Sequence, residues 1–257
     1  MTLFCALPCG LPGAPDGYME RGRFASFEPV FEQYLPAGEV LGSLAVPAVV
    51  AIDGPTNAGK TVFANKLADF YTARGLRVVR LPLDLFLQDR ASRHAIYEAV
   101  AAGAMDIADY SQAAWEQDRY EVNIQLVRGA LTAINKGPLT IARAYDRQTG
   151  RKDRTEEIDL QWPGVILTEG VGIHSYHSGL FDLMVRVDVP DDGVLWQRVL
   201  GRERQKPPEH RLDEAYLKWR YDSVDAPHTA HLRELSAGRA HVVVDTADFN
   251  DMVVYTK

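Results

Sequence analysis

The sequence of 257 residues predicts a three-layer α/β/α fold around a mostly parallel β-sheet. From residue 47 onward, apolar runs of strand length alternate with helical patterns, which is typical of parallel strands covered by helices on both faces. A complete phosphate-binding loop joins the first of these strands to the first helix. The hydrophobic fraction of 46% is ample for a core. We therefore expect a folded domain over residues 47–257. Residues 1–46 should form an N-terminal extension that is partly irregular and contains one helix.

The expected elements of this domain follow from short apolar runs and from helical spacing. The strands cover residues 48–53, 76–81, 139–144, 165–168, 183–189, 241–245 and 252–255. The helices cover residues 62–74, 92–103, 112–135, 193–204, 212–223 and 228–236. Gly75 ends the first helix and the segment 135–138 ends the third, since glycine and proline interrupt helices. The polar stretch 146–159 is expected to be a turn or hairpin.

The segment Gly54-Pro55-Thr56-Asn57-Ala58-Gly59-Lys60-Thr61 fits the Walker A pattern G-x-x-x-x-G-K-[ST] at every specified position. Between a strand and a helix, successive backbone N–H groups and the helix dipole can hold a polyphosphate. Lys60 can reach the terminal phosphates, and the Thr61 hydroxyl can bind Mg²⁺. The residues expected to contact the nucleotide here are Gly54, Thr56, Asn57, Ala58, Gly59, Lys60, Thr61 and Val62. The motif therefore predicts a nucleoside triphosphate as ligand.

Acidic residues follow or end three of the expected strands: Asp53, Asp84 and Glu169. Ligands bind outside the carboxyl ends of the strands in such sheets. Asp84 is the candidate general base for an acceptor hydroxyl and a candidate Mg²⁺ and substrate contact. Glu169 is the second candidate Mg²⁺ ligand and substrate contact, whereas Asp53 suits a structural role equally well.

Other classes of nucleotide-binding protein fit the sequence less well. GTPases read guanine with Asn-Lys-x-Asp, but the segment Asn135-Lys136-Gly137-Pro138 lacks the aspartate. No apolar strand ends in the Asp-Glu pair that is common in motor ATPases. The net charge of −7 argues against general nucleic-acid binding, which depends on Lys and Arg.

Composition also bears on location. No apolar run approaches the roughly 18 residues of a membrane span. Cys5 and Cys9 lack metal-ligand spacing with the histidines, which include His174 and His177. We expect a reduced, cytoplasmic protein that binds no nucleic acid and no membrane, and the sequence is compatible with a homo-oligomer.

Several short motifs, in order, resemble the uridine kinase and phosphoribulokinase group of phosphate-loop kinases over about residues 48–253. After the Walker loop these are Leu83-Asp84-Leu85-Phe86, Asp109-Tyr110, Ala144-Tyr145-Asp146, Ile166-Leu167-Thr168-Glu169-Gly170 and the helix with Arg198 and Arg202. The resemblance implies a nucleoside-kinase-like fold with a helical lid, a requirement for ATP and Mg²⁺, and a small-molecule hydroxyl as acceptor.

The resemblance also implies roles for individual residues. Asp109 should contact a ribose diol, and Tyr145 should contact the substrate. One arginine of the basic hairpin Arg147, Arg151 and Arg154 should face the substrate, and Arg151 is our candidate. Arg198 and Arg202 lie four residues apart on one helix face and should bind the nucleotide phosphates. Residues 202–211 should form a flexible lid that orders over the phosphates when both substrates bind. Lys60, Asp84 and Arg202 are the catalytic candidates.

Two positions depart from the uridine kinase pattern. Leu87 stands where a tyrosine that holds the base is expected, and Gly150 stands where a histidine that contacts uracil is expected. A nucleoside or nucleoside-like acceptor remains the first choice. A sugar or sugar phosphate is the alternative, and a non-catalytic nucleotide-binding regulatory module is the alternative from another class.

Overall fold

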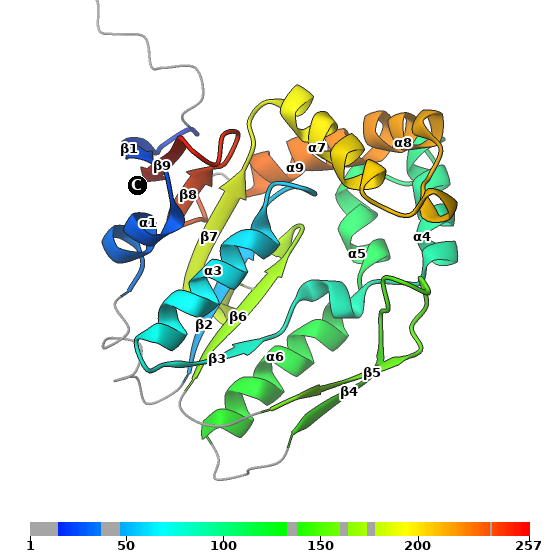
Figure 1. Ribbon diagram of the computed structural model, residues 1–257. Helices are drawn as coiled ribbons and strands as arrows, with labels where there is room; N and C mark the ends of the chain where they lie inside the picture. Colours follow the sequence, from blue (N-terminus) through cyan, green and yellow to red (C-terminus); the bar gives the residue numbers. More distant parts are fainter. Residues whose placement is uncertain (1–14, 37–46, 133–137, 160–163, 174–177, 237) are drawn as a thin grey trace, which may run out of the picture.

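The computed structural model describes residues 15–36, 47–132, 138–159, 164–173, 178–236 and 238–257. Within these ranges one seven-stranded sheet forms the centre of the molecule (Figure 1). Its strands, in spatial order, are β1 (Met19–Phe24), β9 (Met252–Thr256), β8 (Val242–Asp245), β7 (Leu183–Asp188), β2 (Ala48–Asp53), β6 (Gly164–Gly170) and β3 (Arg77–Arg80). The five strands from β8 to β3 are parallel. At one edge, β9 pairs antiparallel with β8, and β1 pairs antiparallel with β9. The predicted three-layer α/β fold with a mostly parallel sheet is confirmed.

Helices cover both faces of this sheet because successive side chains of a strand point to opposite sides. Val50 and Ile52 of β2 belong to a core shared with α1 (Phe27–Tyr34), α3 (Lys60–Ala73) and α7 (Asp192–Arg204). Val49 and Ala51 belong to a second core, shared with α4 (Arg90–Ala101), α5 (Tyr110–Ala114) and α6 (Gln117–Thr132). All of β2 is buried, as its continuous apolar sequence predicts.

The helix expected over residues 112–135 is interrupted at Trp115, which has extended backbone angles and forms an isolated bridge with Leu87. The chain is therefore divided into α5 and α6 at this point. The short 3₁₀ turns η1 (Leu83–Phe86), η2 (Ile107–Asp109), η4 (Ser178–Leu180) and η5 (Pro208–His210) connect other elements.

A second correction concerns the two helices expected over 212–223 and 228–236. The chain runs without a break through α8 (Glu214–Arg220), a π-helical turn η6 (Tyr221–Asp225) and α9 (Ala226–Ser236). The sequence suggested an interruption, but the backbone accommodates Asp222 to Asp225 in one wide turn instead.

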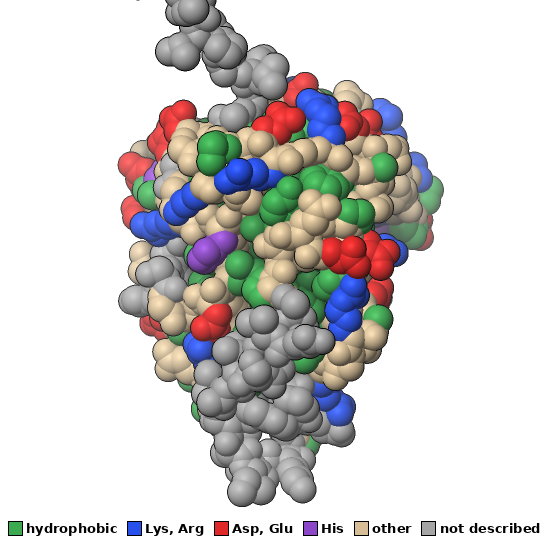
Figure 2. Space-filling view, turned by 90° about the vertical axis from the view of Figure 1, so that its left-hand side faces the viewer, with side chains coloured by type: hydrophobic (Ala, Val, Ile, Leu, Met, Phe, Trp, Pro, Cys, Tyr) green, Lys and Arg blue, Asp and Glu red, His purple; other side chains and the backbone are tan. Residues whose placement is uncertain are grey.

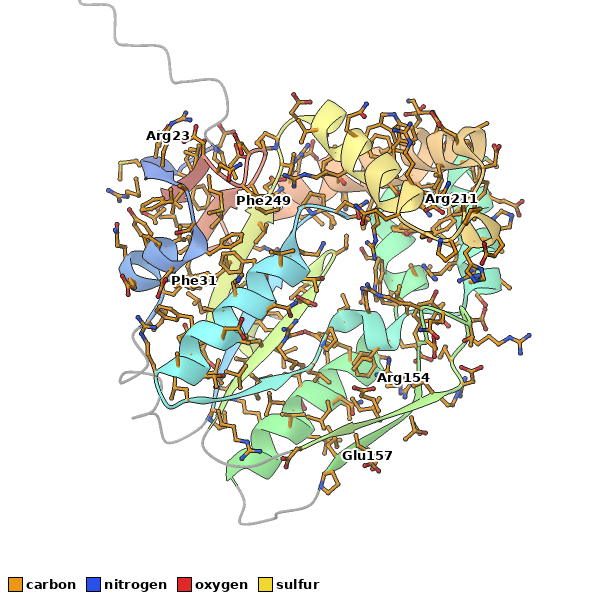
Figure 3. The ribbon with its side chains drawn as sticks, in the orientation of Figure 1. Arg23, Phe31, Arg154, Glu157, Arg211 and Phe249 are labelled. Atoms are coloured by element: carbon orange, nitrogen blue, oxygen red, sulfur yellow. The ribbon has the colours of Figure 1, made fainter. Side chains whose placement is uncertain are left out.

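The polar stretch after residue 146 forms the predicted hairpin. Strand β4 (Leu139–Ala144) pairs antiparallel with β5 (Arg154–Ile158), and the two form a separate small sheet rather than part of the central one. In Figure 3, Arg154 and Glu157 lie on this hairpin, away from the start of α3.

Part of the N-terminal extension packs on the central sheet. Helix α1 matches the predicted helix, and the Phe31 ring lies 5.0 Å from the Phe63 ring of α3. Strand β1 was not predicted, because its sequence MERGRF is charged and its side chains are mostly exposed. This side of the molecule faces the viewer in Figure 2, where hydrophobic side chains gather between charged ones. Cys5 and Cys9 lie outside the described residues, as do His174 and His177.

None of the helices in the described part of the chain has the length and hydropathy that crossing a bilayer would require.

Candidate active site

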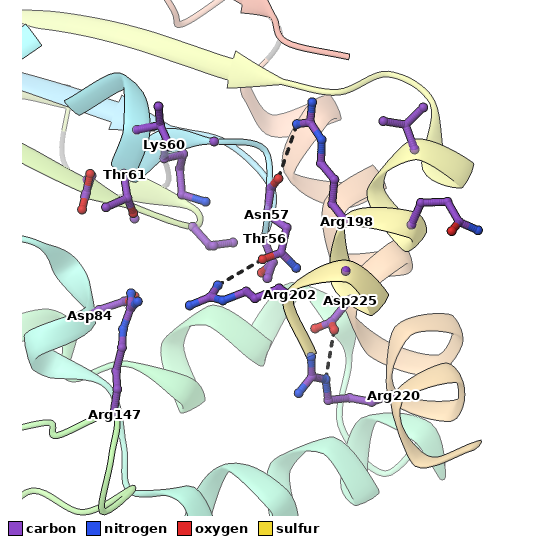
Figure 4. A pocket seen from close by; sticks show the side chains of 18 of the residues that line it. Thr56, Asn57, Lys60, Thr61, Asp84, Arg147, Arg198, Arg202, Arg220 and Asp225 are labelled. Carbon is purple, nitrogen blue, oxygen red and sulfur yellow. Dashed lines mark hydrogen bonds and ion pairs between the residues drawn. The ribbon is translucent and has the colours of Figure 1, made fainter. Parts of the chain in front are cut away.

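A cavity of about 1160 Å³ lies between α7 and the carboxyl ends of β2 and β6. This volume exceeds that of a typical pocket for one drug-sized ligand, so a nucleotide and a second molecule have room. The structure brings most of the expected site residues together in its lining (Figure 4). They are Thr56, Asn57, Gly59, Lys60, Thr61, Val62, Asp84, Glu169, Arg198 and Arg202.

Close backbone packing fixes the conformation of the phosphate loop. Gly54 has φ +148°, and a Cβ there would lie 1.8 Å from the Val187 carbonyl oxygen. Gly59 has φ +100°, and a Cβ there would lie 2.7 Å from the Phe249 ring. Gly54 and Ala58 are in the loop but do not line the cavity. The Ala58 carbonyl instead accepts a hydrogen bond of 2.6 Å from the Thr246 hydroxyl.

Lys60 is the first residue of α3 and points into the cavity (Figure 4). Its Nζ donates a hydrogen bond of 2.7 Å to the Pro55 carbonyl oxygen. Burial lowers the pKa of Lys60 from 10.5 to about 8, although Asp84 and Glu169 act in the opposite direction. A polyphosphate in the loop would replace this weak neutral partner with negative charge.

Glu169 at the end of β6 is 8% exposed. Its Oε1 forms an ion pair of 3.0 Å with Arg80, while Oε2 is buried without a hydrogen-bond partner among the described residues. Burial raises the pKa of Glu169, and Arg80 and Lys60 oppose this. An unpartnered buried carboxylate oxygen near the Thr61 hydroxyl fits a divalent cation that is held mainly by phosphates and these two side chains.

Glycine follows Glu169 for a steric reason. A Cβ at Gly170 would lie 2.5 Å from Cβ of Leu83, so the glycine makes room for η1. This contact holds η1, and with it Asp84, against the end of β6.

Asp84 lies in the first turn of η1 and forms an ion pair with Arg147 (Figure 4). Its side chain is 29% exposed, whereas that of Arg147 is 55% exposed. Of the three hairpin arginines, only Arg147 is among the residues that line the cavity, and its ion pair with Asp84 places it beside η1. The carboxylate faces the same space as Lys60, where it could accept a proton from an acceptor hydroxyl.

The two arginines of α7 have different surroundings. Arg202 donates a hydrogen bond of 3.0 Å to the side chain of Asn57, whose φ is +65°. Arg198 donates to the carbonyl oxygens of Thr246 and Ala247 and lies 4.6 Å from the centre of the Phe249 ring. Arg198 also donates to the carbonyl oxygens of Asn57 and Ala58, at 3.5 and 3.4 Å, so it joins α7 to both the phosphate loop and the segment after β8. Arg202 contacts the loop through a side chain, that of Asn57.

The sequence did not predict the residues at the end of the cavity that lies away from the phosphate loop. Its lining includes Leu87, Arg93, Tyr97, Tyr110, Trp115, Arg220 and Asp225. Arg220 and Asp225 form an ion pair of 3.0 Å across the π-helical turn, in which residues five apart face each other. Burial raises the pKa of Asp225, and Arg220 opposes this. Nothing in the local sequence signals a π turn.

Three expected substrate contacts do not line the cavity. Asp109 is exposed at the end of η2, and Arg151 is exposed on the hairpin. Tyr145 is 6% exposed, and its hydroxyl accepts a hydrogen bond from Arg93, whose guanidinium lies over the tyrosine ring. Tyr145 therefore orients Arg93, which lines the cavity, and does not line the cavity itself. Asp53 has the structural role, since its Oδ1 accepts hydrogen bonds from the backbone of Gly172 and Ile173.

Comparison with solved structures identifies the fold. A possible uridine kinase from Bacillus stearothermophilus superposes with a TM-score of 0.53 at 21% identity, over 80% of this chain and 94% of that chain. A protein described as a fructose transport system kinase from Silicibacter sp. TM1040 gives a TM-score of 0.55 at 16% identity, over 81% and 94%. This is the phosphate-loop kinase fold. No family model matches the chain, and neither does any curated protein.

The phosphate-loop kinase fold confirms the resemblance that the motifs indicated, at the level of architecture. Both of these proteins are described as kinases, and each superposition includes 94% of the kinase chain. In this fold the cavity described above lies at the carboxyl edge of the sheet, where nucleotides bind.

Proposed function

We propose that the protein is a Mg·ATP-dependent kinase that transfers the γ-phosphate to a hydroxyl group of a small polar molecule. One observation carries the proposal: the half-buried Lys60 of a complete phosphate loop shares a cavity with the carboxylates of Asp84 and Glu169. A protein that only binds nucleotide needs the loop, but it does not need a carboxylate facing the terminal phosphate across an open space.

The chain's residues divide the work of phosphoryl transfer. The backbone of the phosphate loop and Lys60 hold the phosphates, and Arg202 supplies positive charge where charge develops on the transferring group. Thr61 and Glu169 would hold Mg²⁺, which when bound neutralises the phosphate oxygens. Asp84 accepts the proton of the acceptor hydroxyl, the hydroxyl oxygen bonds to the γ-phosphorus, and the bond from phosphorus to ADP breaks.

The nature of the acceptor is less constrained by these residues. The preference for a nucleoside depended on Asp109, which lies outside the cavity. Leu87 lines the cavity at the position expected for a base-holding tyrosine, so an apolar contact replaces a polar one. A sugar, sugar phosphate or other hydroxylated metabolite is therefore the favoured second candidate.

We also propose a cytoplasmic location without nucleic-acid or membrane partners. The support is the net charge of −7, which disfavours binding to phosphate backbones and to anionic lipid. Salt-dependent retention on a polyanion column would contradict this proposal.

Asp84→Asn separates a kinase from a regulatory module that binds ATP without turnover. The amide keeps the shape of the carboxylate but cannot accept the proton, so the kcat for ADP release should fall by about 10²- to 10⁴-fold. The Kd for ATP should change little, because the phosphate loop is intact. Lys60→Ala should abolish ATP binding under either hypothesis.

Asp159→Asn is the matched control. Asp159 forms a comparable ion pair of 2.8 Å with Arg77, at the amino end of β3 and away from the cavity. This variant should keep full turnover. Full turnover in Asp84→Asn would exclude Asp84 as the base. If the unaltered protein binds ATP but releases no ADP with any hydroxylated compound, the regulatory module is the better explanation.

A further inference from the structure

Positive charge is in excess at the end of the cavity where the acceptor would lie. Three guanidinium groups line it, those of Arg93, Arg147 and Arg220, together with two carboxylates, those of Asp84 and Asp225. Two of the arginines are paired, Arg147 with Asp84 and Arg220 with Asp225. The third, Arg93, forms no ion pair with a carboxylate among the described residues.

The hydrogen-bond partners of Arg93 are neutral groups, while its charge also acts on the Asp225 carboxylate. Its Nε donates to the Gln88 carbonyl oxygen at 3.0 Å, and Nη1 and Nη2 donate to the hydroxyls of Tyr97 and Tyr145. These partners orient the guanidinium without neutralising it. Trp115 adds a buried indole N–H that has no acceptor within the described ranges. The cavity lining around Arg93 and Trp115 is therefore rich in hydrogen-bond donors.

Arg147 is the most exposed of the three arginines. Its side chain is 55% exposed, it comes from the turn of the β4–β5 hairpin, and its ion-pair partner is the proposed base itself. Burial lowers the pKa of Arg202, and the positive charge of Arg147 lowers it further, so the two guanidiniums repel each other across the cavity. An anion between them would relieve this repulsion.

The ion pair also affects the base. Oδ2 of Asp84 accepts a hydrogen bond from Arg147, so while the pair exists an acceptor hydroxyl has to share that oxygen with Arg147 or use Oδ1. A group that competes for Arg147 would release that oxygen.

We propose that the phosphate acceptor is an anion, a small hydroxylated molecule with a phosphate or carboxylate group, and that this group draws Arg147 away from Asp84. Arg147 is then the residue that determines specificity, and both oxygens of the base are free of Arg147 when an anionic acceptor is bound. The inference rests on the proposed kinase activity and names the class of its substrate. Water, which carries no anionic group, leaves the Arg147–Asp84 pair in place, so acceptor-free ATP hydrolysis stays slow.

Two matched pairs of compounds test the proposal and distinguish the two kinds of anion. Ribose and ribose 5-phosphate differ by a phosphate, and glycerol and glycerate differ by a carboxylate. The unaltered protein should phosphorylate the anionic member of at least one pair in preference to its neutral partner. In Arg147→Gln the KM for that anionic compound should rise by about 10- to 100-fold, the effect of losing a charged hydrogen bond. Arg147→Lys should retain part of the preference, since it keeps the charge.

A second readout does not depend on knowing the acceptor. Acceptor-free ATP hydrolysis should rise by about tenfold or more in Arg147→Gln, because the unpaired Asp84 can then accept a proton from water. Arg77→Gln, which removes a comparable exposed ion pair outside the cavity, should leave hydrolysis unchanged. Thermal unfolding of each variant confirms that it is folded.

The outcomes are distinct. Equal turnover of the neutral and anionic members, or unchanged hydrolysis in Arg147→Gln, would overturn the inference while leaving the kinase proposal intact. If none of the four compounds reacts, the hydrolysis measurement alone decides. A protein that binds ATP but transfers its phosphate to no hydroxyl, in any variant, would instead refute the proposed function.

Discussion

Raising the pH from 7 to 9 should weaken ATP binding by about tenfold, because Lys60 loses its proton in this interval. Burial lowers the pKa of Lys60 to about 8 in the free protein. With that value, about 90% of Lys60 is protonated at pH 7 and about 10% at pH 9. The terminal phosphate of ATP, with a second pKa near 6, stays ionised throughout. If the phosphates bind the protonated lysine, the Kd follows the protonated fraction.

The stability of the free protein should change with the opposite sign. In the unfolded chain Lys60 keeps its proton to about pH 10.4, whereas the folded protein releases it near pH 8. Between these values the unfolded state binds more protons, so the free energy of unfolding rises with pH, by at most about 1.4 kcal/mol per pH unit from this group. Bound ATP should remove this contribution, because the phosphates stabilise the charged lysine.

Isothermal titration calorimetry in two buffers with different ionisation enthalpies measures the proton directly. About 0.5 proton should be taken up per ATP bound at pH 8, where half of Lys60 is deprotonated. Lys60→Arg, which stays charged at pH 9, should show no uptake if it binds ATP. A Kd that is constant from pH 7 to pH 9, or equal uptake in the two proteins, would refute the reasoning.

Two further substitutions test the phosphate loop and the metal site. Gly54→Ala should lower the free energy of unfolding by about 2 kcal/mol or more, because its φ is positive and its Cβ would overlap the Val187 carbonyl. In urea denaturation, Gly129→Ala in helix α6 should be neutral or stabilising, because an added Cβ there would meet no atom of another segment within 4 Å. Equal losses in the two variants would contradict the argument. Glu169→Gln removes the charge but keeps the shape, and should weaken the apparent Mg²⁺ affinity by about 10- to 100-fold in a titration of turnover at fixed ATP. An unchanged Mg²⁺ midpoint would exclude Glu169 as a ligand.

The sequence predicted the parts of the site that local rules determine. The Walker loop specifies its own conformation, and the ends of apolar strands locate Asp84 and Glu169 at one edge of the sheet. Contacts between distant segments were not predictable in this way. Arg147 and Asp84 are 63 residues apart, and nothing in either segment indicates that they pair.

Two other differences have physical causes. Strand β1 has too few apolar residues to be recognised, since it is an edge strand with mostly exposed side chains. The π-helical turn that brings Asp225 to Arg220 depends on packing rather than on a turn motif. Asp109 was expected to contact the substrate because of its place in the order of motifs. That order does not specify whether a side chain points into the cavity or toward solvent.

The pairing of β1 with β9 has a consequence for biosynthesis. Met19–Phe24 leaves the ribosome long before its partner, Met252–Thr256, and at about 5–20 residues per second the delay is roughly 10 to 50 seconds. During this time the charged sequence of β1 has no strand to pair with, and its polarity keeps it from aggregating with other nascent chains. The long sequence separation also raises the contact order, so closing this edge should be a late and slow step of folding. A chain that stops before Met252 would lack β9, and β1 would then have no strand to pair with, so the sheet would lose both strands.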